Sequence, residues 1–184
     1  MKVLLIPEDF RNDQHILKPI FERLFREIGR SSLRVEVCLD PLLGGVTEAL
    51  KSERLQEIVD QYPKIDIFIL CVDRDGIVGR RQRLDQIEDE FGDAFFAENA
   101  WEEIETWVLA GLELPTGWSW REVRAEVSVK ERYFEPFAAE RKLSDAPGGG
   151  RRELGEEAAR HIDAIRLKCP EDFDCLARRL EAAI

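Results

Sequence analysis

Histidine and long apolar runs are scarce in this sequence, and each scarcity excludes a class of protein. Only two histidines, His15 and His161, occur among 184 residues, which argues against a histidine-based metal site. No apolar stretch approaches the roughly 18 residues that a membrane-spanning helix needs. The short apolar run at the N-terminus is followed at once by Glu8 and lacks a small-residue cleavage site, so we expect a first strand and not a signal peptide.

Cysteine is too sparse for a disulfide framework or a zinc site. Cys38 and Cys71 lie in apolar, strand-like runs, where buried free thiols are common. Cys169 and Cys175 have no histidine or second cysteine pair that would complete a zinc site. The sequence therefore predicts a reducing, cytoplasmic compartment and no disulfides.

Positive charge is in deficit, since the formal net charge is −11. This excludes a protein that coats nucleic acid by charge alone. It does not exclude a protein that acts on phosphates through a bound metal, because the acidic ligands of that metal are included in the formal net charge while the metal itself is not. With 44% hydrophobic and 35% charged residues, the chain is predicted to be soluble and globular, with one sizeable core.

Strand-like apolar segments alternate with helical patterns in the first 112 residues. The expected strands are 3–6, 34–39, 65–72 and 94–97. The expected helices are 14–28, 47–61, 84–91 and 101–112, with Pro19 in the first turn of the first helix. This alternation predicts an α/β fold with a Rossmann-like parallel sheet flanked by helices and joined by right-handed crossovers.

The pattern changes after Leu112, where the strand signals end. Helices are expected over about 130–142, 151–168 and 172–183. The stretch DAPGGGRRELG is the strongest linker signal, and Arg151 and Arg152 within it are expected at the surface. Residues 113–184 are therefore predicted to form an all-helical C-terminal extension packed on a core made by residues 1–112.

Acidic residues follow the ends of the expected strands. Glu8 follows the first strand, Asp73 and Asp75 follow the third, and residues 98–105 follow the fourth. Because the carboxyl ends of parallel strands meet at one edge, these acids should gather there. In an extended chain Asp73 and Asp75 would point the same way, since the side-chain period is two. Such oxygen ligands suit Mg²⁺ or Mn²⁺, which would cancel the repulsion between the carboxylates.

The order of these acids resembles the TOPRIM domain of topoisomerases, primases and OLD-family nucleases. The resemblance rests on Glu8 after the first strand and on Asp73-Arg74-Asp75-Gly76 after an apolar strand. AENAWEEIETWVLAG resembles the acidic, Trp-containing helix of small OLD-like TOPRIM proteins, and GGGRRELGEEAARHIDAIRLKCPEDFDCLARRL resembles their helical end. These proteins are often encoded beside an ATPase in phage-defence contexts.

The resemblance implies a nuclease, or a nuclease subunit, that hydrolyses phosphodiesters of DNA or RNA with Mg²⁺ or Mn²⁺. Glu8 matches the TOPRIM glutamate, and Asp73 and Asp75 match its metal-binding pair. The family usually reads Glu-Gly-x-Ser/Thr-Asp/Glu at the first site, whereas this chain lacks the glycine and carries its second acid one residue late, as Asp13. Glu105 matches the acid before the family's tryptophan, as a further metal ligand.

Cationic residues are candidates for contact with the substrate. By the same resemblance, Lys130 would stabilise charge that develops on a phosphate. Arg80, Arg81 and Arg83 lie just beyond the DxDG loop and would hold phosphates through bidentate contacts, or else form a solvated helix start paired with the acids of LDQIEDE. Two cations about 4 Å apart would activate a water and stabilise the leaving oxygen, while one suffices for orientation and neutralisation.

Aromatic residues and two other interpretations remain open. Trp118 and Trp120, in an expected loop, are candidates for base stacking, whereas Trp107 is expected in the core. ILCVDRDGIV also resembles the nucleophile loop of haloacid-dehalogenase phosphatases, with Asp73 attacking phosphorus and Asp75 as acid and base. The third interpretation is a non-catalytic, TOPRIM-like regulatory partner of an ATPase. A second copy of the chain, in a homodimer, is a further candidate partner, and no membrane partner is expected.

Overall fold

The chain folds around a parallel sheet in a computed structural model that describes residues 1–41 and 43–184. The strands are β1 (Lys2–Pro7), β2 (Arg34–Val37), β3 (Ile67–Asp73) and β4 (Phe95–Ala100). Their order across the sheet is β2-β1-β3-β4, and each neighbouring pair runs parallel. The predicted α/β fold with a parallel sheet is therefore confirmed.

Each strand contributes side chains to two cores, because successive residues in a strand point to opposite faces. In β1, Val3 and Leu5 join one apolar cluster, while Leu4 and Ile6 join the other. All four side chains are fully buried. Burial on both faces explains why the strands are nearly continuous apolar runs.

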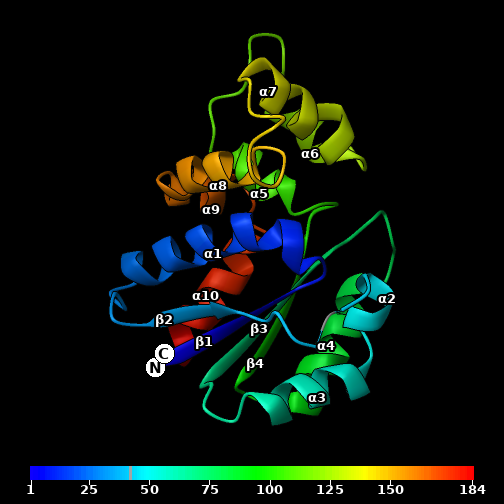
Figure 1. Ribbon diagram of the computed structural model, residues 1–184, viewed down its shortest axis with the longest axis vertical. Coiled ribbons are helices and arrows are strands. Elements are labelled where there is room, and N and C mark those ends of the chain that lie inside the picture. The colour runs from blue at the N-terminus through cyan, green and yellow to red at the C-terminus, as the bar shows by residue number, and fades with distance from the viewer. Residues whose placement is uncertain (42) are drawn as a thin grey trace.

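Helices cover both faces of the sheet, as Figure 1 shows. One face carries α1 (Phe10–Glu27), which connects β1 to β2. The connections from β2 to β3 and from β3 to β4 lie on the other face, and they are α2 (Val46–Ala49), α3 (Ser52–Gln61) and α4 (Arg80–Phe91). From β1 the chain passes to β2, its neighbour on one side within the sheet, and then returns to β3, its neighbour on the other side. The direction of the strand order therefore reverses between β1 and β3.

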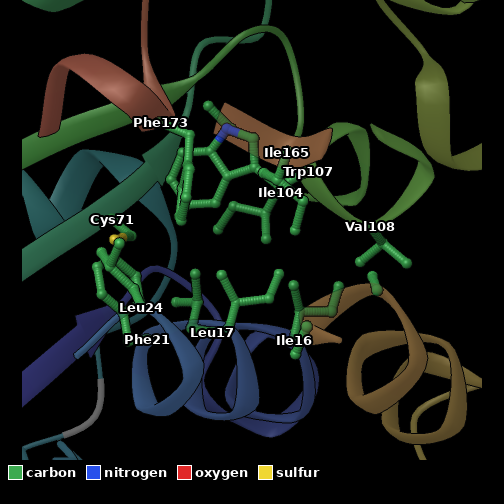
Figure 2. Packing of buried hydrophobic residues seen from close by; sticks show 14 of the residues in the cluster. Ile16, Leu17, Phe21, Leu24, Cys71, Ile104, Trp107, Val108, Ile165 and Phe173 are labelled. Atoms are coloured by element: carbon green, nitrogen blue, oxygen red, sulfur yellow. The ribbon is translucent and has the colours of Figure 1, made fainter. Parts of the chain in front are cut away.

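The C-terminal part is helical and extends the core on the α1 side. Its elements are α5 (Glu105–Ala110), α6 (Trp120–Ala125), the π-helical turn η1 (Lys130–Phe134), α7 (Glu135–Glu140), α8 (Arg151–Ala159), α9 (Ile162–Lys168) and α10 (Phe173–Ala183). Figure 2 shows Trp107 and Phe173 facing the α1 row that includes Leu17 and Phe21. The ring centroids of Trp107 and Phe173 are 5.2 Å apart. One apolar cluster therefore joins the sheet, α1 and the C-terminal helices, with Trp107 in the core as expected.

Two glycines allow α8 to lie very close to α1 and to the end of α5. A Cβ added at Gly155 would lie 2.6 Å from the carbonyl oxygen of His15, and one at Gly111 would lie 2.7 Å from that of Ala158. Real Cβ atoms essentially never approach so closely. The seam between the helical extension and the α/β core therefore depends on these two missing side chains.

Several expected element boundaries are wrong, and two of them move residues near the candidate site. Helix α1 starts four residues earlier than expected, with Asp9 as its N-cap, so Pro19 lies inside the helix and not in its first turn. The Asp9 side chain accepts a hydrogen bond from Arg11 N at 3.0 Å, which fixes that start. Strand β4 continues to Ala100, so Glu98 lies within the strand and not after it.

The glycine-rich stretch is also a packed turn and not a free linker. Gly150 is buried, and a Cβ added at Gly148 would lie 2.9 Å from the His15 ring. The expected helix 151–168 is interrupted, because α8 ends at Ala159 and α9 begins at Ile162. The helix expected over 47–61 is likewise divided into α2 and α3.

The cysteines agree with the sequence expectation that the chain carries no disulfide. All four are free, and Cys38, Cys71 and Cys169 are buried. Among the described residues, no helix combines the length and the apolar character needed to span a bilayer.

Candidate functional site

The carboxyl ends of β1 and β3 meet where the strand order reverses, and ligands of open α/β sheets bind at such a switch point. Glu8 directly follows β1, and Asp73 is the last residue of β3. The backbone N–H of Asp73 donates a hydrogen bond to Glu8 Oε2 at 3.3 Å. The structure therefore brings these two acids together at one edge of the sheet, which we call the carboxyl edge.

Asp75 does not point the way that the extended-chain argument predicts. Its backbone is left-handed, with a φ of 53°, so the chain leaves the strand conformation directly after Asp73. The Asp75 side chain is exposed, and its Oδ2 lies 3.5 Å from Arg80 Nη2. Asp75 still lies near Glu8: burial raises the pKa of Glu8, and the negative charge of Asp75 raises it further.

The DxDG loop is held by Glu102, a residue not predicted from the sequence. The Glu102 carboxylate accepts hydrogen bonds from Gly76 N at 2.6 Å and from Arg74 Nη1 at 2.8 Å. Its carbonyl oxygen accepts from the N–H groups of Arg74 and Asp75, at 2.7 and 3.1 Å. Glu102 itself has a φ of 68°, a conformation that costs a non-glycine residue roughly 1–3 kcal/mol. The sequence signal for Glu102 is its place in the acidic stretch 98–105 that follows the expected fourth strand.

At the carboxyl edge Glu8, Asp13 and Asp73 are half-buried and lie near the buried Glu105. Burial raises the pKa of Asp73 well above its ordinary value, and the nearby charges of Glu105, Asp13 and Glu8 raise it further. Burial also raises the pKa of Asp13 to about 7, with Glu105 and Glu8 again adding to the effect. In the part of the chain that the structure describes, Glu8, Asp13 and Asp73 form no ion pair with a basic side chain, although Arg80 lies close enough to lower the pKa of Glu8 slightly.

Asp13 has a structural role as well as a place beside these acids. Its Oδ2 accepts a hydrogen bond from Asp9 N at 3.0 Å, one turn back along α1. The Asp9 side chain in turn accepts from Arg11 N, so the two acids cap the start of the helix reciprocally. The late position of the second acid thus puts it inside the first turn of α1, where it serves the helix and also faces the carboxyl edge.

Glu105 differs from the other acids because it has a basic partner. Its Oε1 accepts from Arg151 Nε at 2.9 Å and from Arg151 Nη2, while Arg151 Nη1 donates to the carbonyl of Gly148 at 2.8 Å. Both charged side chains are buried, and the guanidinium lies 5.2 Å from the Phe134 ring centroid. The expectation that Arg151 is an ordinary surface residue is therefore wrong, because the packed glycine turn brings the start of α8 against α5.

The donor chemistry of the carboxyl edge fits Mg²⁺ or Mn²⁺, which prefer carboxylate oxygens. No group of three or more Asp, Glu, His or Cys side chains among the described residues is arranged to hold a metal ion. Mg²⁺ is usually held by one or two carboxylates, with water and substrate phosphates in its other positions, so a complete cage is not required. The raised pKa values of Asp73 and Asp13 favour a cation here, and Glu8 and Asp73 are the residues that would hold it.

Lys130 lies beside Glu103. The backbone N–H of Lys130 donates to Glu103 Oε2 at 2.6 Å, and Lys130 Nζ is 3.9 Å from Glu131 Oε1. Burial raises the pKa of Glu103 to about 7, and the charge of Glu105 adds to that rise. Lys130 is therefore connected to the carboxyl edge through Glu103 and Glu105, and its contacts among the described residues do not include Asp73.

Arg80 lies beside the acids of the carboxyl edge. Its side chain is 8% exposed, and its Nη2 pairs with Asp75 at 3.5 Å. Its buried Nε has no hydrogen-bond partner among the described residues. A buried guanidinium with an unused donor is suited to an anionic ligand.

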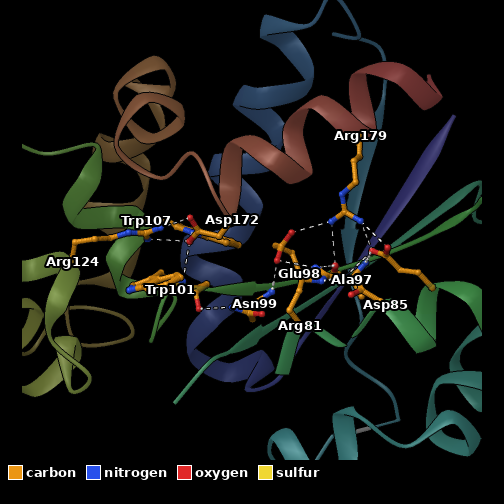
Figure 3. Close-up of polar contacts among 12 residues, drawn as sticks. Arg81, Asp85, Ala97, Glu98, Asn99, Trp101, Trp107, Arg124, Asp172 and Arg179 are labelled. Atoms are coloured by element: carbon orange, nitrogen blue, oxygen red, sulfur yellow. Dashed lines mark hydrogen bonds and ion pairs between the residues drawn. The ribbon is translucent and has the colours of Figure 1, made fainter. Parts of the chain in front are cut away.

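Arg81 and Arg83 are held by the protein itself. Arg81 Nη1 donates to Glu98 Oε1 at 2.8 Å, and Arg179 Nη2 donates to the other Glu98 oxygen at 3.0 Å, as Figure 3 shows. Arg83 Nη2 donates to the carbonyl of Leu50 at 2.8 Å. Of the three predicted phosphate ligands, only Arg80 contacts an acid of the predicted metal site.

The tryptophans also differ in whether they lie near the predicted metal site. Trp118 packs edge-on against Tyr133, with ring centroids 4.9 Å apart, and Trp120 has Lys168 Nζ 5.5 Å from its ring centroid. Trp101 instead contacts the DxDG loop, because the Arg74 guanidinium lies 4.1 Å from its ring centroid. Trp101 is thus the tryptophan placed beside the carboxyl edge.

Comparison with protein-family models, with curated protein sequences and with solved structures finds no match for this chain. The molecule is an α/β protein whose acids meet at a switch point of its sheet. A functional assignment therefore rests on the residues described above and on their chemistry.

Proposed function

We propose that this chain is a metal-dependent phosphodiesterase of the TOPRIM-like nuclease type, which hydrolyses DNA or RNA alone or as the nuclease subunit of a defence complex with an ATPase. The observation that carries the proposal is the meeting of Glu8 and Asp73 at the switch point of a parallel sheet. Both are acids whose pKa is raised by burial, and neither forms an ion pair within the described residues. A divalent cation would balance their charge.

Glu8 and Asp73 are the proposed direct metal ligands, and Asp75 would join them on release from Arg80; Asp13 and Glu105, the other acids of the predicted set, already cap α1 and pair with Arg151. When bound, the ion would neutralise phosphate charge and make a bound water more acidic. The protein's own part is to orient the carboxylates. Ile104 N donates to Asp73 Oδ1 at 2.8 Å, and Asp73 N donates to Glu8, so both acids are oriented by backbone groups before a ligand arrives.

Arg80 is the proposed contact for a substrate phosphate. Its pair with Asp75 is long at 3.5 Å, and its free Nε can donate to a phosphate oxygen. Lys130 is the second proposed contact, acting from the side of Glu103. If a phosphate replaced Asp75 as the partner of Arg80, the Asp75 carboxylate would become free to bind the metal.

Cleavage assays on plasmid DNA, single-stranded DNA and RNA, with Mg²⁺, Mn²⁺ or EDTA, test this proposal. We expect cleavage only with metal, and a loss on the order of 1,000-fold in Asp73→Asn, since several kcal/mol of transition-state stabilisation depend on the ion. Asp93→Asn, an exposed acid after α4, is the matched control and should leave the rate unchanged. Equal rates in wild type and Asp73→Asn would point to a contaminant and end the proposal.

One observation favours a second candidate, a non-catalytic regulatory partner of an ATPase. Glu105 is paired with Arg151, and Asp13 caps α1, so part of the predicted ligand set already serves the fold. On this account the protein binds divalent metal, and an Mg²⁺-dependent rise in melting temperature is present, but wild type cleaves none of the substrates.

A further inference from the structure

Two adjoining hollows run along the outer side of α1. The first, of about 580 Å³, lies between α1 and α8 and is lined by His15 and Arg152, among others. The second, of about 530 Å³, continues past the end of α1 toward the start of β2. Both hollows share Lys18 and Arg26 in their walls, so they form one continuous surface, which we call the α1 groove.

The α1 groove is basic although the protein is strongly acidic. Seven lysine and arginine side chains line it against two glutamates, whereas the whole chain has a formal net charge of −11. Its cations include Lys18, Arg26, Arg30, Arg34, Arg152 and Arg160. Acids elsewhere on the surface are screened beyond a Debye length of about 10 Å at 0.1 M salt, so a ligand in the groove responds chiefly to the local cations.

Three of these cations are not used by the fold. Lys18, Arg30 and Arg160 are exposed and form no ion pair with the residues that the structure describes. Other cations of the groove do have partners, as in the contact of Arg152 with Glu156 at 3.4 Å. Like charges that gather without internal partners raise the free energy of the folded protein, unless an anionic ligand compensates them.

The shape and the direction of the groove favour an extended polyanion. The helix rises about 1.5 Å per residue, so the eight steps from Lys18 to Arg26 span about 12 Å, the length of a few phosphates along a nucleic-acid strand. At one end the groove is lined by Gln14 and His15, which directly follow Asp13 of the carboxyl edge. A concave path of this kind admits a narrow polymer, whereas a flat lipid surface would reach only its rims.

We propose that the α1 groove binds the sugar–phosphate backbone of a nucleic acid and leads it toward the carboxyl edge. That direction rests on the proposed nuclease function, whereas binding in the groove does not. The contacts are to phosphates, so binding is independent of base sequence and weakens steeply with salt.

Binding is measured without cleavage, in the Asp73→Asn background with EDTA, by fluorescence anisotropy of a labelled single strand and a labelled duplex across a salt series. The test variant is Lys18→Glu/Arg30→Glu/Arg160→Glu. The control is Lys64→Glu/Arg121→Glu/Lys142→Glu, which makes the same change in net charge at exposed residues outside the groove. Circular dichroism and melting temperature establish that both variants are folded.

We expect the groove variant to lose at least about tenfold in affinity near 0.1 M salt, and the slope of log K against log salt to fall by about 2 to 3. The control variant should change by less than about threefold. Equal losses in the two variants, no loss in the groove variant, or displacement of the nucleic acid by polyglutamate or by phosphatidylserine vesicles at equal charge would overturn the proposal. Groove-dependent binding by a wild-type protein that cleaves nothing would uphold the groove and refute only the nuclease function.

Discussion

Two groups of acids in this molecule differ in their basic partners: Asp172 and Asp174 at the start of α10 are paired with arginines, whereas Glu8, Asp13 and Asp73 at the carboxyl edge form no ion pair within the described residues. At the start of α10, Asp172 accepts from Arg124 Nη2 at 2.7 Å, and Asp174 accepts from Arg166 Nε at 2.6 Å. Burial acts to raise the pKa of Asp174, but hydrogen bonds from Arg166 and Arg178 outweigh it and lower that pKa. These acids hold the C-terminal helix in place and need nothing from outside the chain.

At the carboxyl edge no hydrogen bonds from the arginines that the structure describes offset the effect of burial on the pKa of Asp73 and Asp13. The pKa values of Asp73 and Asp13 are raised, first by burial and then by neighbouring acids. Loss of solvent is therefore not what distinguishes a candidate site in this protein, because it raises or acts to raise the pKa of acids in both groups. The missing basic partner distinguishes it, since an acid used only for structure is normally paired.

The largest effect is expected from Asp172→Ala, which removes a paired acid. Asp172 Oδ2 also accepts from Trp107 Nε1 at 2.8 Å and from Trp101 N at 2.9 Å. The substitution leaves Arg124 and two donors without their acceptor, so we expect a loss of about 4 kcal/mol in the free energy of unfolding, measured in urea. Asp73→Asn, measured in EDTA, should lose nothing. Similar losses in the two variants would remove the distinction between the regions.

The next effect comes from converting the one paired acid of the carboxyl edge into an unpaired one. Arg151→Met leaves Glu105 buried without its cation, and we expect a loss of about 3 kcal/mol in the free energy of unfolding. Adding Glu105→Gln removes the unpaired buried charge and should restore most of that stability. A double variant as unstable as the sum of its two single variants would show that the pair has no coupling.

The pH dependence of stability sharpens the comparison further. Asp13 has an ordinary pKa of 3.8 and a folded pKa of about 7, so the folded state binds more protons between these values. Its contribution to stability is complete below about pH 4 and is lost as the pH rises through about 7. In EDTA we therefore expect wild type to lose on the order of 2 kcal/mol from about pH 5 to about pH 8.

Two additions identify the cause of that loss. Asp13→Asn should flatten the decline, and Mg²⁺ should raise the melting temperature more at high pH, where the acids are ionised, than at low pH. A metal effect that is the same at both pH values would contradict a site made of these carboxylates.

The smallest effect is expected for an exposed ion pair, which sets the baseline for the others. Arg141 Nη2 lies 2.7 Å from Glu157 Oε2, and both side chains are more than 30% exposed. Glu157→Gln should change the free energy of unfolding by less than about 1 kcal/mol. A larger loss would mean that charge pairs outside the buried regions also hold the helical extension.

The parallel sheet could be predicted because its strands are apolar on both faces, as in IFILCVD of β3. The approach of Glu8 to Asp73 followed from topology alone, since parallel strands end at one edge. Boundaries were less predictable. Pro19 argued for a later helix start, but buried neighbours such as Ile16 and Ile20 anchor α1 on both sides of the missing N–H.

The contacts of individual site residues could not be predicted, because they join distant parts of the chain. Arg151 is buried through its contact with Glu105, which lies 46 residues away. Glu98 continues β4 as a charged residue only because Arg81 and Arg179 reach it from α4 and α10. Neither pairing leaves a local pattern in the sequence, so Arg151 was expected at the surface and Glu98 among the acids that follow the fourth strand.

The four hydrogen bonds that Glu102 accepts from the DxDG loop bear on how this edge would receive an ion. Ordering a flexible loop costs about 1–2 kcal/mol per residue in backbone entropy. Here that ordering is already complete in the folded protein, so the receptor is preorganised. Uptake of a cation would then be limited by stripping water from the ion and from the carboxylates, and not by any rearrangement of the chain.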